Sequence, residues 1–278
     1  MNLLLLSSSR VGTTGYLSHA VPLIEKFLSA KQALTPLRVL FIPYAGVTID
    51  FGQYESSVKE ALNSLNIELV SIHHYSSNND SKNNGDSYLS PSDSSAPDVS
   101  KPDVSKQNLL KEQFAKADCI LVGGGNTFSL IKQLYKLDLI KIIQDEVKAG
   151  KPYIGWSAGS NIAGATIRTT NDMPIVEPPS FDALNLLPWQ LNPHYIETNP
   201  SGHNGETRQQ RLEEFLVANP QSKVIAIPEG TAIICKEKSI IFTEGEQKKS
   251  LAYVFSANAK VSISTETDIS QLLENTSN

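Results

Sequence analysis

Cysteine is scarce in this sequence, and its scarcity excludes two kinds of architecture. Only Cys119 and Cys235 occur among 278 residues, and each lies within an apolar, strand-like run. Two such residues cannot build the disulfide framework of a small secreted domain or a thiolate metal centre. We therefore expect a protein of a reducing compartment, the cytoplasm.

The sequence also lacks a marked excess of one charge and a long apolar run. Its 24 basic and 29 acidic residues give a net charge of -5, and neither sign forms a long run. This balance argues against nucleic acid or an anionic membrane as a partner. The run Leu3–Leu6 has no basic residue before it and ends at Ser7, too short for a signal core or a membrane span. Small molecules or short peptides are the expected partners.

Short apolar runs alternate with stretches of helical periodicity through the first part of the chain. This alternation predicts an α/β fold with a doubly wound, mostly parallel sheet. The length favours one domain over residues 1–278. Short strand-like runs after Val224 predict a β-rich closing segment, followed by a short polar C-terminal tail. The expected strands are Leu3–Ser7, Val39–Tyr44, Glu68–His73, Cys119–Gly123, Tyr153–Trp156, Val224–Ile227, Ala232–Cys235 and Ile240–Phe242.

The stretch from Ser76 to about Lys106 has a different composition from the rest. It consists largely of Ser, Asn, Asp, Pro and Lys, and Asp98–Lys101 is nearly repeated at Asp103–Lys106. Such a segment cannot bury enough apolar area to offset the entropy of ordering. We expect a disordered surface insertion here, with a functional lid as the alternative.

Gly155-Trp156-Ser157-Ala158-Gly159 is the strongest local motif. It follows a predicted strand and precedes a helix-compatible run, the context of a nucleophile elbow. Glycine two residues before and two after the serine avoids Cβ collisions in that strained turn. Ser157 is therefore the expected nucleophile, and the N–H of Ala158 would point at the oxyanion.

Gly123-Gly124-Gly125-Asn126 forms a second glycine-rich turn between a predicted strand and a helix. Its backbone N–H groups can approach an anion closely, which predicts a second oxyanion donor at Gly124 or Gly125, or a clamp for a carboxylate. A dinucleotide-binding fingerprint is the rival interpretation. It needs a glycine or alanine where Phe128 stands, so we prefer the oxyanion site.

A serine nucleophile needs a base, and the candidates are histidines. His194 follows a proline that restricts its loop, whereas His203 lies in a glycine-rich loop, so we expect His194 to be the base. Two acids lie between nucleophile and base in the sequence, Asp172 and Glu177. The residue pattern alone does not choose between them.

Arg208 lies at a predicted helix start, where Thr207 and Gln210 have capping-box spacing. A cation in the first turn opposes the helix dipole, and an acidic ligand would compensate for that cost. The alternative is an exposed arginine paired with Glu206 or Glu214.

With these motifs in place, the chain resembles the peptidase E (α-aspartyl dipeptidase) family of serine peptidases, which also includes cyanophycinase. The stretches that carry the resemblance are Phe41–Thr48, Val122–Phe128, Tyr153–Gly159, Thr166–Pro174, Asn192–His194 and Gly202–Arg208. The 76–106 insertion is a departure from the compact form of that family.

The resemblance implies a fold similar to the class I glutamine amidotransferase domain and a catalytic triad in the order serine, aspartate, histidine. That order corresponds to Ser157, Asp172 and His194. The implied reaction is hydrolysis of dipeptides with N-terminal aspartate, without metal or organic cofactor. The sequence itself leaves both a monomer and a homodimer open. A cyanophycinase-like or isoaspartyl peptidase acting on β-linked aspartate, and a non-catalytic binding module, are the alternatives.

Selectivity for aspartate requires a fixed cation in the substrate site. Arg208 is the first candidate, because a guanidinium can clamp a carboxylate through two hydrogen bonds. Arg168 is the second candidate, since it shares a motif with Asp172. Asn126 and Trp156 complete the set of residues expected to bind substrate.

Overall fold

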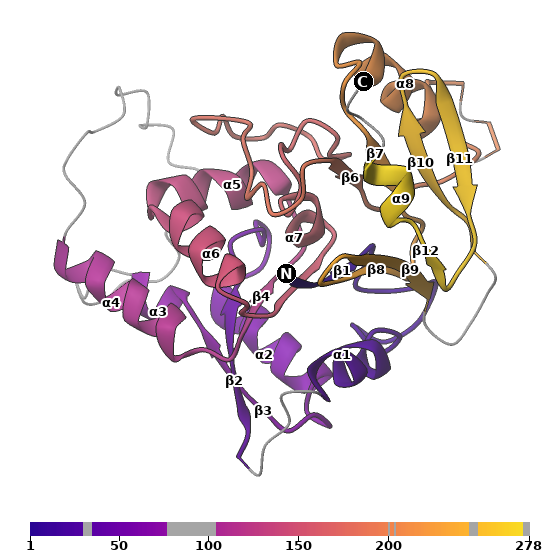
Figure 1. Cartoon of the computed structure of the whole chain (residues 1–278). Coiled ribbons are helices and arrows are strands. Elements are labelled where there is room, and N and C mark those ends of the chain that lie inside the picture. Colours follow the sequence, from indigo (N-terminus) through magenta and orange to yellow (C-terminus); the bar gives the residue numbers. More distant parts are fainter. Residues whose placement is uncertain (30–34, 77–103, 200, 203, 245–249, 275–278) are drawn as a thin grey trace.

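An eight-stranded sheet forms the centre of the computed structural model, which describes residues 1–29, 35–76, 104–199, 201–202, 204–244 and 250–274 (Figure 1). Its strand order is β12-β9-β8-β1-β5-β4-β2-β3. The five neighbouring strands β1-β5-β4-β2-β3 all pair in parallel. On the other side of β1, the strands β8, β9 and β12 extend the sheet with antiparallel pairs. The predicted doubly wound, mostly parallel sheet is therefore confirmed. The strands are β1 (Asn2–Leu6), β2 (Leu37–Ile42), β3 (Ile67–Ser71), β4 (Cys119–Val122), β5 (Tyr153–Trp156), β8 (Thr231–Lys236), β9 (Ser239–Glu244) and β12 (Thr267–Asp268).

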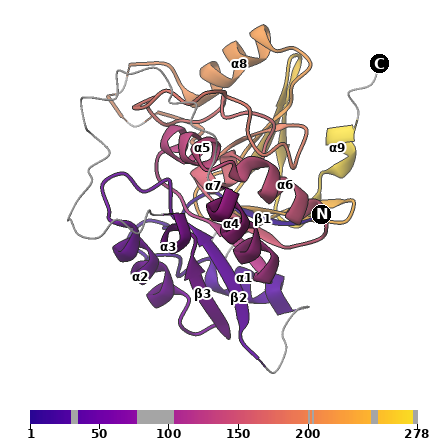
Figure 2. The same ribbon diagram turned by 90° about the vertical axis from the view of Figure 1, so that its left-hand side faces the viewer.

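Helices cover both faces of this sheet because its parallel strands are apolar on both sides (Figure 2). In β1, Leu3 and Leu5 belong to one core cluster, and Leu4 and Leu6 to the other. The first cluster packs under α4 (Val104–Lys116), α5 (Thr127–Lys136) and α6 (Leu139–Lys148), and the second under α1 (Val21–Leu28) and α2 (Phe51–Ala61). Two four-residue helices, α3 (His73–Ser76) and α7 (Ala158–Asn161), follow β3 and β5.

A second, four-stranded sheet of order β11-β10-β7-β6 contains part of the closing segment. Its strands are β6 (Gln190–Asn192), β7 (Val224–Ala226), β10 (Ala252–Ser256) and β11 (Ala259–Ile263). α8 (Arg208–Ala218) contacts β10 of this sheet, and α9 (Ser270–Glu274) contacts β9 of the larger sheet. β6 and β7 are parallel, with Asn192 opposite Ala226. The loops that follow these two strands therefore leave the sheet side by side. The predicted β-rich closing segment is confirmed, and it extends both sheets.

The predicted 76–106 insertion is only partly described. Ser76 ends α3, and residues 104–106 form the first turn of α4, so these two ends are helical rather than coil. The helical continuation is explained by Leu110 and Phe114, which are fully buried on α4. The expectation for 77–103, like that for the polar tail at 275–278, lies outside the described residues. None of the helices in the described part of the chain is long and apolar enough to cross a bilayer.

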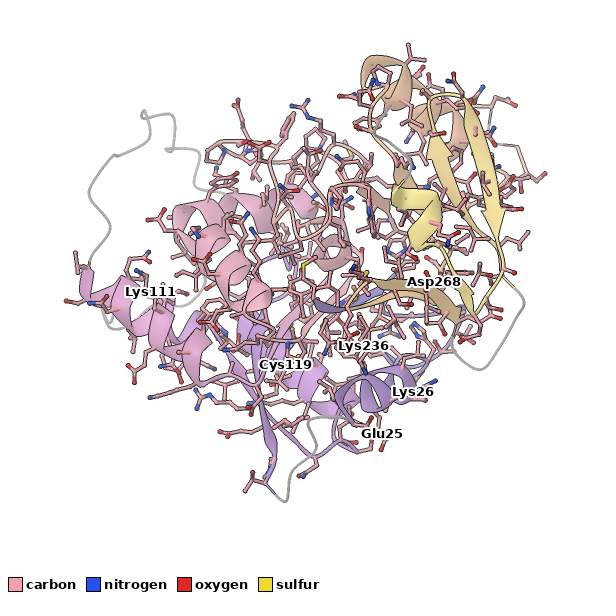
Figure 3. The ribbon with its side chains drawn as sticks, in the orientation of Figure 1. Glu25, Lys26, Lys111, Cys119, Lys236 and Asp268 are labelled. Carbon is pink, nitrogen blue, oxygen red and sulfur yellow. The ribbon has the colours of Figure 1, made fainter. Side chains whose placement is uncertain are left out.

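Both cysteines lie in the interior as thiols, not joined by a disulfide. Cys119 is on β4, within the sheet (Figure 3). Burial raises the pKa of the Cys235 thiol to about 12. Both residues therefore act as small apolar side chains of the core.

Candidate active site

Ser157 lies in the sharp turn between β5 and α7. Its φ of 53° and ψ of -114° place a non-glycine residue in a sparsely populated region of backbone space. The turn is held by hydrogen bonds from Ser157 N to Leu6 O at 3.1 Å and from Ser160 Oγ to Leu6 O at 2.7 Å. This strained strand-to-helix turn is the predicted nucleophile elbow.

Gly155 and Gly159 are required by the packing of this turn. A Cβ at Gly155 would lie 2.4 Å from the carbonyl oxygen of Gly159, and a Cβ at Gly159 would lie 2.2 Å from that of Val122. Both distances are far shorter than a van der Waals contact. The two glycines therefore let α7 pack directly against β4 and β5. This packing places Ser157 at the carboxyl edge of the sheet.

His194 is presented to Ser157 by the loop that follows β6. Its Nε2 lies 2.9 Å from Ser157 Oγ, and its backbone N–H donates to Ser7 Oγ at 2.9 Å. The backbone φ is 57°, so His194 is a second strained residue at the site. The structure brings together the two residues that the sequence predicts as nucleophile and base.

The acid beside His194 is Glu229, and here the structure corrects the predicted Asp172. Oε1 of Glu229 lies 2.9 Å from Nδ1 of His194. A carboxylate can only accept, so Nδ1 carries the proton and Nε2 is left to accept from the hydroxyl of Ser157. Glu229 follows β7, next to the loop of His194, because β6 and β7 are parallel neighbours.

Asp172 instead caps the first turn of α5. Its Oδ2 accepts from Thr127 N at 2.7 Å and from Thr127 Oγ1 at 2.6 Å. An anion at a helix N-terminus is stabilised by the orphan N–H groups there. In the same loop, Met173 O accepts from Asn126 Nδ2 at 2.9 Å. Asp172 therefore anchors its loop to α5, and Glu177, the other acid considered, is an exposed residue farther along that loop.

The predicted oxyanion donors lie against the nucleophile. A Cβ at Gly124 would be 3.0 Å from Ser157 Cβ and 2.8 Å from Trp156 Cδ1, so this backbone touches the elbow. The N–H groups of Gly124, Gly125 and Ala158 have no acceptor among the residues that the structure describes. They are available to an oxyanion at Ser157.

Gly124 is held in place through its carbonyl. The hydroxyl of Tyr54 donates to Gly124 O at 2.8 Å. Burial holds the pKa of Tyr54 well above its usual value, so this hydroxyl remains a donor. A Cβ at Gly125, whose φ is 135°, would lie 2.1 Å from Ala45 O, which explains why this turn needs glycine.

Comparison with known proteins identifies the family of this chain. The family model described as "Peptidase family S51" matches residues 3–94 and 88–243. The chain belongs to peptidase family S51. A relative named peptidase E from Actinobacillus pleuropneumoniae serotype 5b (strain L20) is 47% identical over 232 residues, which cover 84% of each chain. Peptidase E of Shewanella oneidensis (strain MR-1) is 45% identical over 275 residues, which cover 99% of each.

Solved structures show the same fold. A putative peptidase E from Listeria monocytogenes EGD-e has 27% sequence identity and a TM-score of 0.60, covering 88% of this chain and 99% of the other. A peptidase from an acI-B1 Actinobacterium, with 14% identity and a TM-score of 0.60, covers 96% of each chain and supports the fold. The chain is thus a serine-type S51 peptidase acting on peptides.

Among the residues predicted to bind substrate in this S51 peptidase, Trp156 and Asn126 line the cavity at Ser157. Trp156 is almost fully buried and stacks on Phe41. Asn126 caps α5 by accepting from Ser129 N.

The two arginines predicted to read aspartate have different environments. Arg208 is half-buried in the first turn of α8, where Thr207 and Gln210 form the predicted capping box. Burial and the neighbouring Arg211 lower the pKa of Arg208, and the charges of Asp172 and Glu229 act in the opposite direction. Arg168 is exposed, and its guanidinium lies 5.1 Å from the centroid of the Phe181 ring. Arg208 is therefore the partly desolvated one, with charges of both signs nearby.

Two residues of the site region escaped the sequence reasoning, Glu229 and Arg10. Both lie in the loop that follows a strand, Glu229 three residues after the end of β7 and Arg10 four residues after the end of β1. The signal that could have found them is this position, because loops at the carboxyl edge of parallel strands carry the ligand site. His203, the alternative base considered from the sequence, lies outside the described residues.

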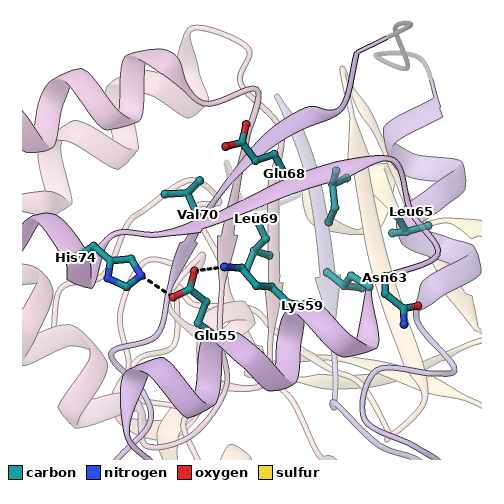
Figure 4. A pocket seen from close by; sticks show the side chains of 10 residues that line it. Glu55, Lys59, Asn63, Leu65, Glu68, Leu69, Val70 and His74 are labelled. Atoms are coloured by element: carbon teal, nitrogen blue, oxygen red, sulfur yellow. Dashed lines mark hydrogen bonds and ion pairs between the residues drawn. The ribbon is translucent and has the colours of Figure 1, made fainter.

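One cluster in the described chain has the composition of a metal site. One ligand atom each from Glu55, His73 and His74 lies within 4.8 Å of the other two. Both oxygens of Glu55 are already paired, Oε1 with Lys59 Nζ at 2.8 Å and Oε2 with His74 Nε2 at 2.7 Å (Figure 4). A metal ion would have to displace the Lys59 ammonium. The cluster is an ion-pair network between α2 and α3, and the pocket beside it shares no lining residue with the cavity at Ser157.

Proposed function

We propose that this S51 peptidase is a dipeptidase that hydrolyses the bond after an N-terminal aspartate, using Ser157, His194 and Glu229 as its catalytic triad. The observation that carries the proposal is the chain of two 2.9 Å contacts from Glu229 Oε1 through the His194 ring to Ser157 Oγ. Its position at a nucleophile elbow fits acyl transfer. The peptidase E name of the relatives supports the substrate class.

The reaction proceeds in two acyl-transfer steps. Ser157 Oγ attacks the aspartyl carbonyl carbon, and its proton passes to His194 Nε2 while Glu229 stabilises the imidazolium. The tetrahedral oxyanion accepts hydrogen bonds from Ala158 N and from Gly124 or Gly125 N. His194 then gives the proton to the leaving amine, the carbon–nitrogen bond breaks, and an aspartyl ester on Ser157 remains. Water repeats the sequence and releases aspartate, so the residues present supply every proton transfer.

Arg208 is proposed to bind the side-chain carboxylate of the N-terminal aspartate. A half-buried guanidinium fixed on a capped helix gives both the charge and the depth that would separate aspartate from asparagine and glutamate. Arg168 is the second candidate, and its exposure and its stacking on Phe181 make it the weaker one. We place the protein in the cytoplasm, consistent with its two buried thiols, as a monomer or homodimer.

The test is hydrolysis of Asp-Leu, Glu-Leu, Asn-Leu and β-Asp-Leu by the purified protein. Cleavage of Asp-Leu alone supports the proposal, and cleavage of β-Asp-Leu alone would replace it with an isoaspartyl peptidase. Ser157→Ala and His194→Ala should each remove nearly all turnover, since members of a triad act as a unit. A wild-type chain that cleaves none of these substrates and is not labelled at Ser157 by an active-serine probe would be a binding module.

A further inference from the structure

The cavity that opens at Ser157 is larger than an aspartyl residue needs. It has a volume of about 950 Å³ and extends from Ser157 and His194 along the loops that follow β1, β2 and β4. Its lining includes the apolar side chains of Val47, Ile49, Ala61 and Ile175. The cavity therefore has room and apolar lining for the residue on the leaving side of the scissile bond.

Arg10 supplies the permanent positive charge among the residues that line this cavity. Glu60 is the other charged residue among those that line it, and Arg208 does not line the cavity. Arg10 is exposed and makes no ion pair with any residue in the described parts of the chain. Its guanidinium lies 5.7 Å from the centroid of the Tyr16 ring. An anionic group of a ligand in the cavity would therefore find its charge partner in Arg10.

The loop that carries Arg10 is tied to the catalytic machinery. Leu17 N donates to Ser9 O at 2.7 Å, and Ser8 Oγ donates to Arg10 O at 2.8 Å, which closes the loop around Arg10. Tyr16 lies under the guanidinium, and its hydroxyl donates a hydrogen bond to the hydroxyl oxygen of Tyr54 at 3.2 Å.

That second tyrosine leads back to the oxyanion turn. The hydroxyl of Tyr54 donates to Gly124 O at 2.8 Å, and the Tyr16 ring packs edge-on against Trp156, with centroids 6.3 Å apart. Arg10 is thus linked, through Tyr16 and Tyr54, to the turn of the oxyanion donors and to the residue before Ser157.

We propose that Arg10 binds the α-carboxylate of the leaving residue and so restricts the enzyme to dipeptides. The inference rests on the proposed function and adds a second specificity residue to it. A dipeptide with N-terminal aspartate carries two carboxylates, on the aspartate side chain and at the C-terminus. Arg208 lies among Asp172 and Glu229 and is assigned to the first, which leaves the cavity cation for the second.

The chemical difference between a free C-terminal carboxylate and a peptide carbonyl explains how Arg10 would distinguish dipeptides from longer peptides. In a dipeptide the carboxylate carbon is two bonds from the scissile nitrogen, so a cation in the cavity can reach it. In a longer peptide or a dipeptide amide the same position is a neutral carbonyl, which cannot form the charge-assisted, bidentate pair. A site of this kind gains binding energy only from substrates that end one residue after the cleaved bond.

The test compares Asp-Leu with its C-terminal amide, Asp-Leu-NH₂, and with Asn-Leu. Arg10→Met should lower kcat/KM for Asp-Leu by about 10-fold to 100-fold, the range for losing a hydrogen bond to a charged group. The loss should appear mainly in KM. Activity on Asp-Leu-NH₂ should remain nearly unchanged, and activity on Asn-Leu should fall as much as that on Asp-Leu. Arg10→Lys should recover part of the loss, because it keeps the charge without the fork.

Lys26→Met is the matched control, since it removes one exposed positive charge from α1 (Figure 3), outside the cavity. Equal losses on Asp-Leu and its amide, or no loss on either, would overturn the inference. A loss confined to Asp-Leu relative to Asn-Leu would overturn it too, by giving Arg10 the aspartate side chain. If the wild-type enzyme cleaves only β-Asp-Leu, the proposed function fails, and the comparison of that substrate with its amide still decides the role of Arg10.

Discussion

Nδ1 of His194 and Oε1 of Glu229 lie 2.9 Å apart, although 35 residues separate them in the sequence. The contact exists because β6 and β7 are parallel neighbours and each residue belongs to the loop at the end of its strand. It fixes the proton on Nδ1 and leaves Nε2 as the acceptor for Ser157. In the proposed triad, Glu229 is therefore the acid that orients His194.

Glu229→Gln should reduce kcat for Asp-Leu by about 100-fold to 1000-fold, because an amide can donate to Nδ1 and favour the wrong tautomer. The carboxyl side chain is 52% exposed, so the free energy of unfolding should hardly change. Steady-state kinetics and chemical denaturation measure the two effects. Near wild-type kcat in this variant would remove Glu229 from the triad.

Asp172→Ala should have the complementary signature. It removes the acceptor of two short hydrogen bonds at the start of α5, and we expect a loss of about 1–2 kcal/mol in the free energy of unfolding. Asp172→Asn should lose less, since its amide oxygen can still accept. Activity should fall only to the extent that the substitution disorders the loop that contains Asn126. Unchanged stability in Asp172→Ala, with turnover lost, would return a catalytic role to Asp172.

Most of the fold and two of the three residues of the proposed triad could be predicted from local sequence, for a physical reason. Buried parallel strands are short apolar runs, and a nucleophile elbow is confined to five consecutive residues, so both leave a local pattern. Glu229 leaves none, because its contact depends on which strands of the second sheet are neighbours. Asp172 was implied by the resemblance to a family with the triad order serine, aspartate, histidine, and that order does not encode the pairing of β6 with β7. Arg10 was missed because a single arginine in a serine-rich loop has no periodicity.

Gly159→Ala should destabilise the protein severely. The new Cβ would lie 2.2 Å from Val122 O, a backbone atom of a central strand that cannot move aside cheaply. We expect a loss of about 3 kcal/mol, with a lower Tm and little activity. Gly15→Ala is the matched control, since its Cβ would meet Ser18 at an ordinary 3.7 Å. A wild-type Tm in Gly159→Ala would contradict the packing argument.

The ionisation of Glu55 should make the free energy of unfolding depend on pH. Burial raises the pKa of Glu55, but Lys59 and His74 lower it, and the net shift is below the ordinary 4.5. Because the pKa of Glu55 is lower in the folded state, its contribution to the free energy of unfolding is complete above the pKa of the unfolded state. That contribution is lost as the pH falls through the pKa of the folded state. Wild-type stability should thus drop below about pH 4.5.

Glu55→Gln should be less stable than wild type at pH 7 by about 1 kcal/mol, and the difference should shrink on acidification. Denaturation curves at several pH values measure it. Glu112→Gln on α4 is the control, because its pair with Lys116 is exposed on both sides and should not matter. A stability difference for Glu55→Gln that is independent of pH would exclude an ionic contribution.

The last prediction concerns the selectivity assigned to Arg208. Arg208→Met removes a half-buried guanidinium and should lower kcat/KM for Asp-Leu by about 2–4 kcal/mol, or roughly 30-fold to 1000-fold. Its effect on Asn-Leu should be much smaller, whereas Arg10→Met should affect both substrates alike. The two variants thus separate the two carboxylates of the dipeptide. Arg168→Met is the control and should leave both rates near wild type. If Arg208→Met weakens Asp-Leu and Asn-Leu equally while Arg168→Met discriminates between them, the aspartate side chain is bound by Arg168.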